Sequence, residues 1–301
     1  MLKRISLLIL VLGISFSSIA AEGIQKLKVQ STENSYTVTS TFRDTNLVIA
    51  SPRIIETYTD YLIWESIQWG LVRLYAKLGD YFPNTQYAGF DTVNVEHLLT
   101  HTSGYPEARS ISDVEALLFK PSEKYLPSNL NAELLKKVIA VRHGEGFYVV
   151  FPKWMQKIGL DNTEFITKDR TLSTTKKDLA NWLNLWSTKS LLKPDVLNYF
   201  FSPQVQSESK KYSYAWELLG EDRLLAFDPK SPKEFMAIDA KNQWAIYVKS
   251  DTDFTHEDCV RIFNAENASK TKNNYLPILF VSAILLVLLI FLKRRKKAVS
   301  A

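Results

Sequence analysis

The stretch His97–Pro106, HLLTHTSGYP, decides how this chain of 301 residues is interpreted. Its first half places two leucines between polar residues, which is typical of the end of a short helix. Its second half, SGYP, holds a glycine, which accepts positive φ angles, and a proline, which fixes φ. The pattern therefore predicts a short helix that runs into a tight turn.

The residues on both sides of this stretch extend the pattern. Upstream, Gly70 is followed by a short strand with Leu71 and Leu74, and then by a Leu-x-x-Tyr-x-Pro segment at Leu78, Tyr81 and Pro83. With VNVEHLLTHTSGYPE (93–107), this text resembles the serine β-lactamase and penicillin-binding-protein-like family, which includes class C β-lactamases, D-Ala-D-Ala carboxypeptidases and related esterases. In that family the segment follows the helix that carries the nucleophile and helps to build the wall beneath the active site.

The resemblance continues in the family's order and covers most of Leu47–Asp251, with gaps. The later matching segments are KIGLDNTEF (157–165), LSTTKKDLANWLNLWSTKSLLKPDVLNYFFSPQ (172–204), YSYAWELL (212–219) and FMAIDAKNQWAIYVKSD (235–251). It implies an α/β (α+β) fold of the β-lactamase/transpeptidase type, in which helices flank an antiparallel sheet. We assign this domain to residues 22–265.

Local patterns are consistent with such a fold. Gln25–Phe42 alternates polar and apolar residues, which predicts a hairpin of two strands with its turn at Glu33 and Asn34. NLVIAS adds a short strand that ends at Ser51. Apolar residues at mixed spacings of three and four predict a mostly buried helix over Ile54–Trp69, with Pro52 in its first turn.

Both ends of the chain carry membrane-type signals. Residues 1–21 have a basic start, an apolar run and a small-residue cleavage site, as a secretory signal peptide does; an uncleaved anchor is the alternative. A polar tether (266–275) precedes Leu276–Leu292, which is long and apolar enough to cross a bilayer. Five consecutive cations open the tail 293–301, which we therefore expect in the cytoplasm. A C-terminal sorting signal that is later cut is the alternative.

This layout predicts a single-pass protein of the inner or plasma membrane, whose main domain lies outside the cytoplasm and, in a Gram-negative cell, in the periplasm. Seven of the 37 cationic residues lie in the two end segments, which carry no acid, so 30 cations face 32 acids between them. The net charge of +5 therefore reflects topology and does not indicate nucleic-acid binding. Cys259 is the single cysteine, which excludes an intrachain disulfide, and no zinc-type spacing predicts a metal.

The first catalytic element that the resemblance implies is Ser-x-x-Lys at the start of the nucleophile helix. Serine and lysine three residues apart are neighbours on a helix surface, so the lysine can handle the serine's proton. The text VIAS places Ser51 at the nucleophile position, but its partner position holds Ile54. Counting back from Gly70 shifts the register by two and places Arg53 and Glu56 in the two roles. Neither register supplies a serine with a lysine.

The second element is usually Tyr-x-Asn, whose tyrosine shares in proton transfer. Its counterpart here is Pro127-Ser128-Asn129, which retains Asn129 but has proline in the tyrosine place. Tyr125 lies two residues earlier, and a shift in the loop would bring it to the site. Its alternative role is in packing or at the surface.

The third element, a Lys-Thr-Gly or His-Thr-Gly strand, is also altered. The chain has no glycine after Gly220, so a close approach of backbone to substrate is lost. Lys230 and Lys233 offer charge in the corresponding stretch, although a solvated loop is the simpler interpretation.

Other pairs have catalytic residue types. Ser173–Lys176 and Ser190–Lys193 repeat the Ser-x-x-Lys spacing, but they fall where the family has surface structure, so we attribute them to chance. His101 and Ser103 could form a new dyad, yet the family residues at these places are structural, and two residues of a tight turn need not face each other.

All three catalytic elements are altered, while the segments between them still resemble the family. This combination predicts a membrane-anchored, catalytically degenerate homologue with a binding or regulatory role at the cell envelope. The expected partners are the membrane and either a peptidoglycan peptide or an envelope protein, without nucleic acid, metal or cofactor. One alternative is an active serine hydrolase (an esterase, D-Ala-D-Ala carboxypeptidase or β-lactamase-like enzyme) that uses Ser51, with Tyr125 and Asn129 as further site residues. Another is a structural subunit of an envelope complex.

Overall fold

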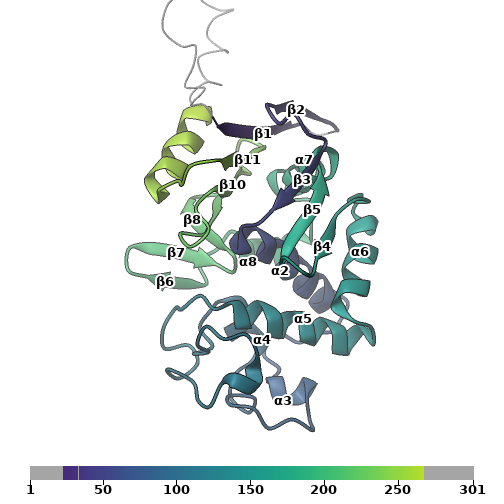
Figure 1. Ribbon diagram of the computed structural model, residues 1–301, viewed down its shortest axis with the longest axis vertical. Helices are drawn as coiled ribbons and strands as arrows, with labels where there is room; N and C mark the ends of the chain where they lie inside the picture. Colours follow the sequence, from purple (N-terminus) through teal and green to yellow (C-terminus); the bar gives the residue numbers. More distant parts are fainter. Residues whose placement is uncertain (1–22, 33, 268–301) are drawn as a thin grey trace, which may run out of the picture. The chain divides into compact units, whose positions relative to one another are not determined.

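Eight antiparallel strands form the larger of two sheets in this domain (Figure 1). The computed structural model describes residues 23–32 and 34–267. The strand order is β2-β1-β11-β10-β9-β8-β7-β6. These strands are β1 (Ile24–Ser31), β2 (Tyr36–Ser40), β6 (Val205–Ser207), β7 (Lys210–Ser213), β8 (Trp216–Gly220), β9 (Arg223–Phe227), β10 (Glu234–Asp239) and β11 (Trp244–Ser250). The pairing of β1 with β11 joins the two ends of the domain, with Ile24 opposite Ser250 and Gln30 opposite Trp244.

A second sheet of three strands lies in the order β3-β5-β4. Its strands are β3 (Asn46–Ile49), β4 (Glu164–Ile166) and β5 (Thr171–Thr175). β3 pairs antiparallel with β5, and Ile49 lies opposite Leu172. Because β3 ends just before the long helix that follows, this pairing fixes where that helix begins.

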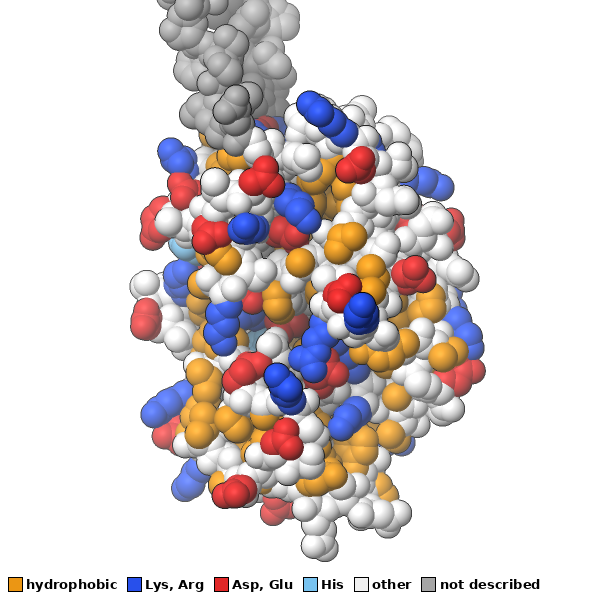
Figure 2. Space-filling view, viewed as in Figure 1, with side chains coloured by type: hydrophobic (Ala, Val, Ile, Leu, Met, Phe, Trp, Pro, Cys, Tyr) orange, Lys and Arg blue, Asp and Glu red, His pale blue; other side chains and the backbone are white. Residues whose placement is uncertain are grey.

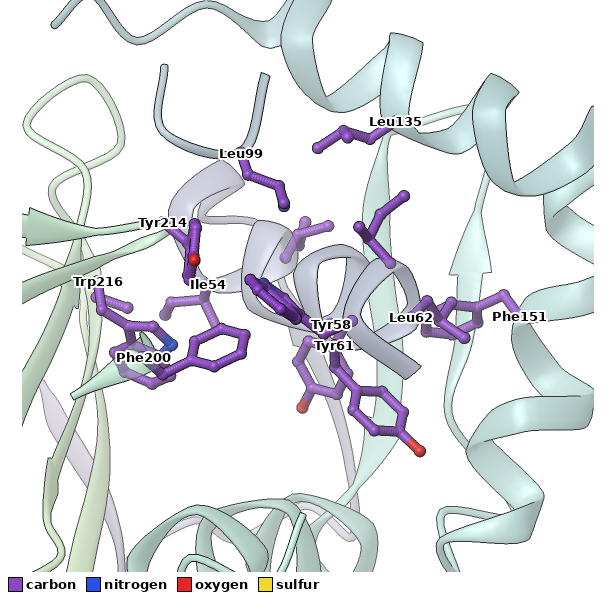
Figure 3. Close-up of a cluster of buried hydrophobic side chains, with 14 of the residues drawn as sticks. Ile54, Tyr58, Tyr61, Leu62, Leu99, Leu135, Phe151, Phe200, Tyr214 and Trp216 are labelled. Carbon is purple, nitrogen blue, oxygen red and sulfur yellow. The ribbon is translucent and has the colours of Figure 1, made fainter. Parts of the chain in front are cut away.

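The helices follow the expected apolar spacing. They are α2 (Pro52–Gln68), α3 (Leu78–Tyr81), α4 (Val95–Leu99), α5 (Asn129–His143), α6 (Phe147–Lys157), α7 (Lys176–Ser187), α8 (Pro194–Phe200) and the short 3₁₀ helix η2 (Ile111–Asp113). α2 is buried over most of its length, as its mixed apolar spacing indicates. Figure 3 shows Ile54, Tyr58 and Leu62 of α2 among buried side chains from several other elements, including Leu99, Leu135, Phe151, Phe200 and Trp216.

A buried carboxylate fixes the start of α2. Ser51 is the N-cap residue, but its side chain makes no capping hydrogen bond. Instead the Glu234 Oε2 atom, from β10, accepts the backbone N–H of Ala50 at 3.0 Å and of Ser51 at 3.2 Å. The other carboxylate oxygen of Glu234 lies 2.9 Å from the Lys249 Nζ atom. A side chain of the larger sheet therefore satisfies backbone donors that open the helix.

The stretch HLLTHTSGYP forms the predicted helix end and turn. α4 closes at Leu99, and the chain then turns at His101 and Gly104, which both have positive φ, 53° and 81°. A Cβ at position 104 would collide with the carbonyl oxygen of Phe119, so glycine is required there.

The predicted hairpin and helix are confirmed: β1 and β2 pair with each other, and α2 covers the predicted span to within two residues. Glu33 of the expected turn lies outside the described residues, as do residues 1–22 and 268–301, and with them the predicted signal peptide, membrane span and basic tail. Within the described part, none of the helices has the length and apolar character that a membrane span needs. The described chain forms one compact unit up to Phe254, and residues 256–267 of the next unit are helical.

Candidate active site

Arg53 and Glu56 lie one turn apart at the start of α2 and form an ion pair. The Arg53 Nη1 atom is 3.2 Å from the Glu56 Oε2 atom, and the two side chains are 12% and 11% exposed. These are the two positions that the register counted from Gly70 assigns to the nucleophile and its lysine. The tertiary structure therefore brings a salt bridge, and not a serine with a lysine, to this place.

The turn after α4 adds a histidine to this pair. The His101 Nε2 atom lies 3.0 Å from the Arg53 Nη1 atom and 3.4 Å from the Glu56 Oε2 atom. Its other ring nitrogen lies 3.1 Å from the Asn131 Nδ2 atom, on α5. The backbone of His101 is in the left-handed region, which residues other than glycine rarely adopt, and the surrounding turn holds it there.

Tyr125, from the loop before α5, contacts Arg53. Its hydroxyl accepts a hydrogen bond from the Arg53 Nη2 atom at 3.1 Å. Its ring stacks on that of Tyr212 from β7, with centroids 4.3 Å apart and planes 14° apart. Asn129 is turned elsewhere, since its Nδ2 atom donates to Glu107 at 2.6 Å. We call Arg53, Glu56, His101 and Tyr125 the Arg53 cluster.

The charges of the Arg53 cluster support one another. Burial acts to lower the pKa of Arg53, but the charges of Glu56, Tyr125, Asp228 and Asp60 together outweigh it, so the pKa is raised above its usual value. Burial likewise acts to raise the pKa of Glu56, yet Arg53 and His101 leave it lowered. Burial raises the pKa of Tyr125, and Arg53 opposes that shift. At neutral pH the pair is therefore an arginine cation and a glutamate anion.

A further buried acid, Asp60, lies one turn along α2. Burial, and then the charge of Glu56, raise its pKa well above the usual value. The Asp60 Oδ2 atom accepts the backbone N–H of Ala215 at 3.0 Å. Two neighbouring carboxyl groups on one helix thus have pKa values shifted in opposite directions, because only Glu56 is ion-paired with Arg53.

Ser51 takes no part in the cluster. It is fully buried, and its Oγ atom has no hydrogen-bond partner among the described residues. Ile54, three residues on, is a core residue. A hydroxyl that is shielded from solvent in this way is not placed to attack a substrate from an open cleft.

The other sequence candidates also lie apart from the cluster or pair differently. Ser173 belongs to β5, and the Lys176 Nζ atom donates to the carbonyl oxygen of Phe42. Ser103 donates to the Asn131 Oδ1 atom at 2.7 Å and not to His101, so it forms no direct dyad.

The stretch that takes the place of the third element forms the turn between β9 and β10. Lys230 and Lys233 line a surface hollow there, together with Glu234 and Lys249. Asp228 is the residue of this turn that acts on the cluster, because its negative charge helps to raise the pKa of Arg53. Among the described residues, no group of three or more histidine, cysteine or acidic side chains is arranged to hold a metal ion.

Sequence reasoning missed Tyr212, Asn131 and Glu234. No local motif marks them, because each reaches the start of α2 or its neighbours only through a distant element. The signal for Glu234 was a glutamate directly before the apolar residues 235–238 of strand β10, since a buried carboxylate requires partners.

Comparison with known proteins supports the fold and the family. The family model described as Beta-lactamase matches residues 65–176. A β-lactamase of Mycobacterium bovis aligns at 16% identity over 79% of this chain and 90% of its own, with a TM-score of 0.61. A penicillin-binding protein of Bacillus halodurans aligns at 16% identity over 80% and 95%, with a TM-score of 0.63. The search of curated protein sequences gave no match.

A third solved structure is EstCE1, described as a hydrolase with promiscuous acyltransferase activity. It aligns at 14% identity over 84% of this chain and 96% of its own, with a TM-score of 0.64. At these identities the likeness to solved structures shows the fold. Together with the matched segment 65–176, it supports a relationship to the serine β-lactamase and penicillin-binding-protein-like family.

Proposed function

We propose that this chain is a non-hydrolytic, membrane-anchored member of its family, which acts by binding at the cell envelope. The observation that carries the proposal is the Arg53–Glu56 ion pair, at the two positions where the family's nucleophile and lysine would lie one helical turn apart. His101 and Tyr125 hold this pair through further hydrogen bonds.

The chemistry of these side chains supports the proposal. A guanidinium group has five N–H donors, no acceptor and a proton that it does not release, so Arg53 cannot attack a carbonyl. Glu56 is a weakened base, because burial is outweighed by Arg53, His101 and Lys136, which together leave its pKa lowered. Ser51 is the hydroxyl-bearing residue nearest to Arg53 in sequence, and it is fully buried.

The test is covalent labelling of the full chain, purified in a mild detergent, with a fluorescent penicillin. A penicillin-binding protein with an intact Ser-x-x-Lys serves as the positive control, and Ser51→Ala is the matched variant. We expect no label and no hydrolysis of p-nitrophenyl acetate above the level of the Ser51→Ala protein. Label or turnover that disappears in Ser51→Ala would instead establish an active serine hydrolase.

The proposed location rests on the ends of the sequence. The domain would lie outside the cytoplasm, held by the span Leu276–Leu292, with the basic tail inside. Alkaline phosphatase fused after residue 265 should be active, and green fluorescent protein fused after Ala301 should fluoresce in the cytoplasm. The reverse pattern would overturn this topology.

We further propose that the bound partner is a peptidoglycan peptide or an envelope protein, since both are accessible to a domain in that location. Co-purification from membranes, followed by digestion with a peptidoglycan hydrolase, separates the two. A partner lost on digestion is a wall fragment, whereas one that resists digestion is a protein.

A further inference from the structure

A hollow lies between α2 and α5, next to the Arg53 cluster. Its cavity volume is about 80 Å³. Each helix contributes four residues at matching intervals, and the turn between β4 and β5 adds one more: Pro52, Ile55, Glu56, Thr59, Asn129, Ala132, Glu133, Lys136 and Arg170. Because residues three and four apart share a helix face, one face of each helix lines the hollow.

The walls combine apolar surface with charge of both signs. Pro52 and Ile55 from α2 face the hollow along with Ala132 from α5. Glu56 adds a negative charge to the lining and Lys136 a positive one, and the charge of Lys136 helps to lower the pKa of Glu56. Figure 2 shows charged side chains of both signs gathered near the middle of the face that it draws.

The lining carries two acids and two cations, but one of the cations has no partner among them. Glu56 is paired with Arg53, and the Glu133 Oε1 atom is 2.9 Å from the Lys136 Nζ atom. Arg170 is exposed at the rim and has no ion-pair partner in the described part of the chain. Because Glu56 is already paired with Arg53, which does not line the hollow, the positive charge of Arg170 is left without a partner and favours an anion.

Two further groups bear on what the hollow can bind, the Glu107 carboxylate and the Thr59 hydroxyl. Both oxygens of Glu107, which does not line the hollow, already accept from Asn129, through its backbone N–H and its Nδ2 atom. Thr59 borders the hollow and is 1% exposed, and its hydroxyl has no partner among the described residues. A buried hydroxyl without a partner is costly, and an oxygen atom held in the hollow is the kind of group that would satisfy it.

We propose that this hollow binds a small organic carboxylate. Arg170 pairs with the carboxylate, and Lys136 adds a second positive charge to the site. A short hydrocarbon body packs against Pro52, Ile55 and Ala132. The proposal rests on the function proposed above, in which the domain acts by binding. A free short-chain acid and an N-acylated amino acid both offer this chemistry.

The experiment titrates the full chain in detergent with butanoate and with N-acetylalanine, and follows binding by ligand-observed NMR. Butanamide, which has the same shape without the charge, is the matched control. We expect saturable binding of at least one acid and none of the amide. Tighter binding of butanoate would indicate a free short-chain acid as the ligand, and tighter binding of N-acetylalanine an N-acylated amino acid.

Variants locate the site. Arg170→Gly removes the charge and tolerates the left-handed backbone at this position, so it should weaken binding about tenfold. Ala132→Leu should abolish binding by filling the hollow. Lys168→Ala, an exposed cation in the same turn that does not line the hollow, should leave binding unchanged.

The outcomes separate the two proposals. Absence of saturable binding, or binding that Arg170→Gly and Ala132→Leu leave intact, overturns the carboxylate site while a negative penicillin label still supports a non-hydrolytic protein. A positive label that requires Ser51 overturns the proposed function itself, whatever the acids do.

Discussion

Two buried glutamates act on the first turns of α2, and they do so differently. Glu234 comes from β10 and accepts the backbone N–H groups of Ala50 and Ser51. Glu56 belongs to the helix itself and pairs with the side chains of Arg53 and His101. Both are almost completely buried. Glu234 binds the main chain, whereas Glu56 binds side chains that a substitution could replace.

The difference separates what holds the fold from what defines the site. The backbone donors that Glu234 satisfies would be present whatever the side chains of α2 were, so Glu234 contributes to folding directly. The partners of Glu56 exist only because arginine and histidine occupy those positions. The first glutamate therefore maintains the helix start, and the second maintains a polar cluster where the family would carry out catalysis.

The largest effect should come from Glu234→Ala. It leaves two backbone N–H groups without their acceptor and Lys249 without its ion-pair partner, so we expect the free energy of unfolding to fall by about 4 kcal/mol. Urea unfolding followed by tryptophan fluorescence measures this. Glu221→Ala, which removes an exposed acid whose side chain is 81% exposed, is the control and should change little. Equal losses in the two variants would contradict the main-chain role of Glu234.

A smaller loss is expected for the Arg53 cluster. Arg53→Met removes the main partner of the buried Glu56 charge and should cost about 3 kcal/mol. Glu56→Gln in the same protein should restore part of that loss, because it removes the charge that Arg53 balanced. The double-mutant cycle, measured by the same unfolding experiment, should therefore give a coupling energy of about 1–3 kcal/mol. Additive losses would show that the pair does not act as a unit.

The smallest effects concern pH, and the two acids of α2 should act with opposite sign. The pKa of Glu56 is lowered in the folded state, so its stabilisation is present above its ordinary value and is lost as pH falls below that value. The pKa of Asp60 is raised, so the folded state holds its proton more tightly, and stability falls as pH rises through the raised value.

Unfolding measured at a series of pH values separates these contributions. Glu56→Gln should flatten the loss of stability on the acid side. Asp60→Asn keeps an acceptor for the Ala215 N–H and should remove the decline as pH rises. If both variants keep the pH profile of the parent chain, the opposite shifts assigned to these two acids are wrong.

The sequence predicted much of the frame. The hairpin of β1 and β2, the buried helix α2 and the turn at Gly104 each depend on patterns within a few residues, namely alternation, apolar spacing and a glycine that no other residue can replace. The site was predicted only in part. Arg53 and Glu56 appeared as one of two registers, and Tyr125 appeared as an alternative to Pro127.

The amino-acid sequence by itself determined that no serine and lysine stand one turn apart at the start of this helix, because that spacing is local and can be read directly. Only the tertiary structure decided that Arg53 and Glu56, and not Ser51, join His101 and Tyr125. These contacts connect residues 48 and 72 positions apart, and packing sets such distances. A shift of two residues along a helix turns a side chain to a different face, so the choice between registers depended on which face met the α4 turn.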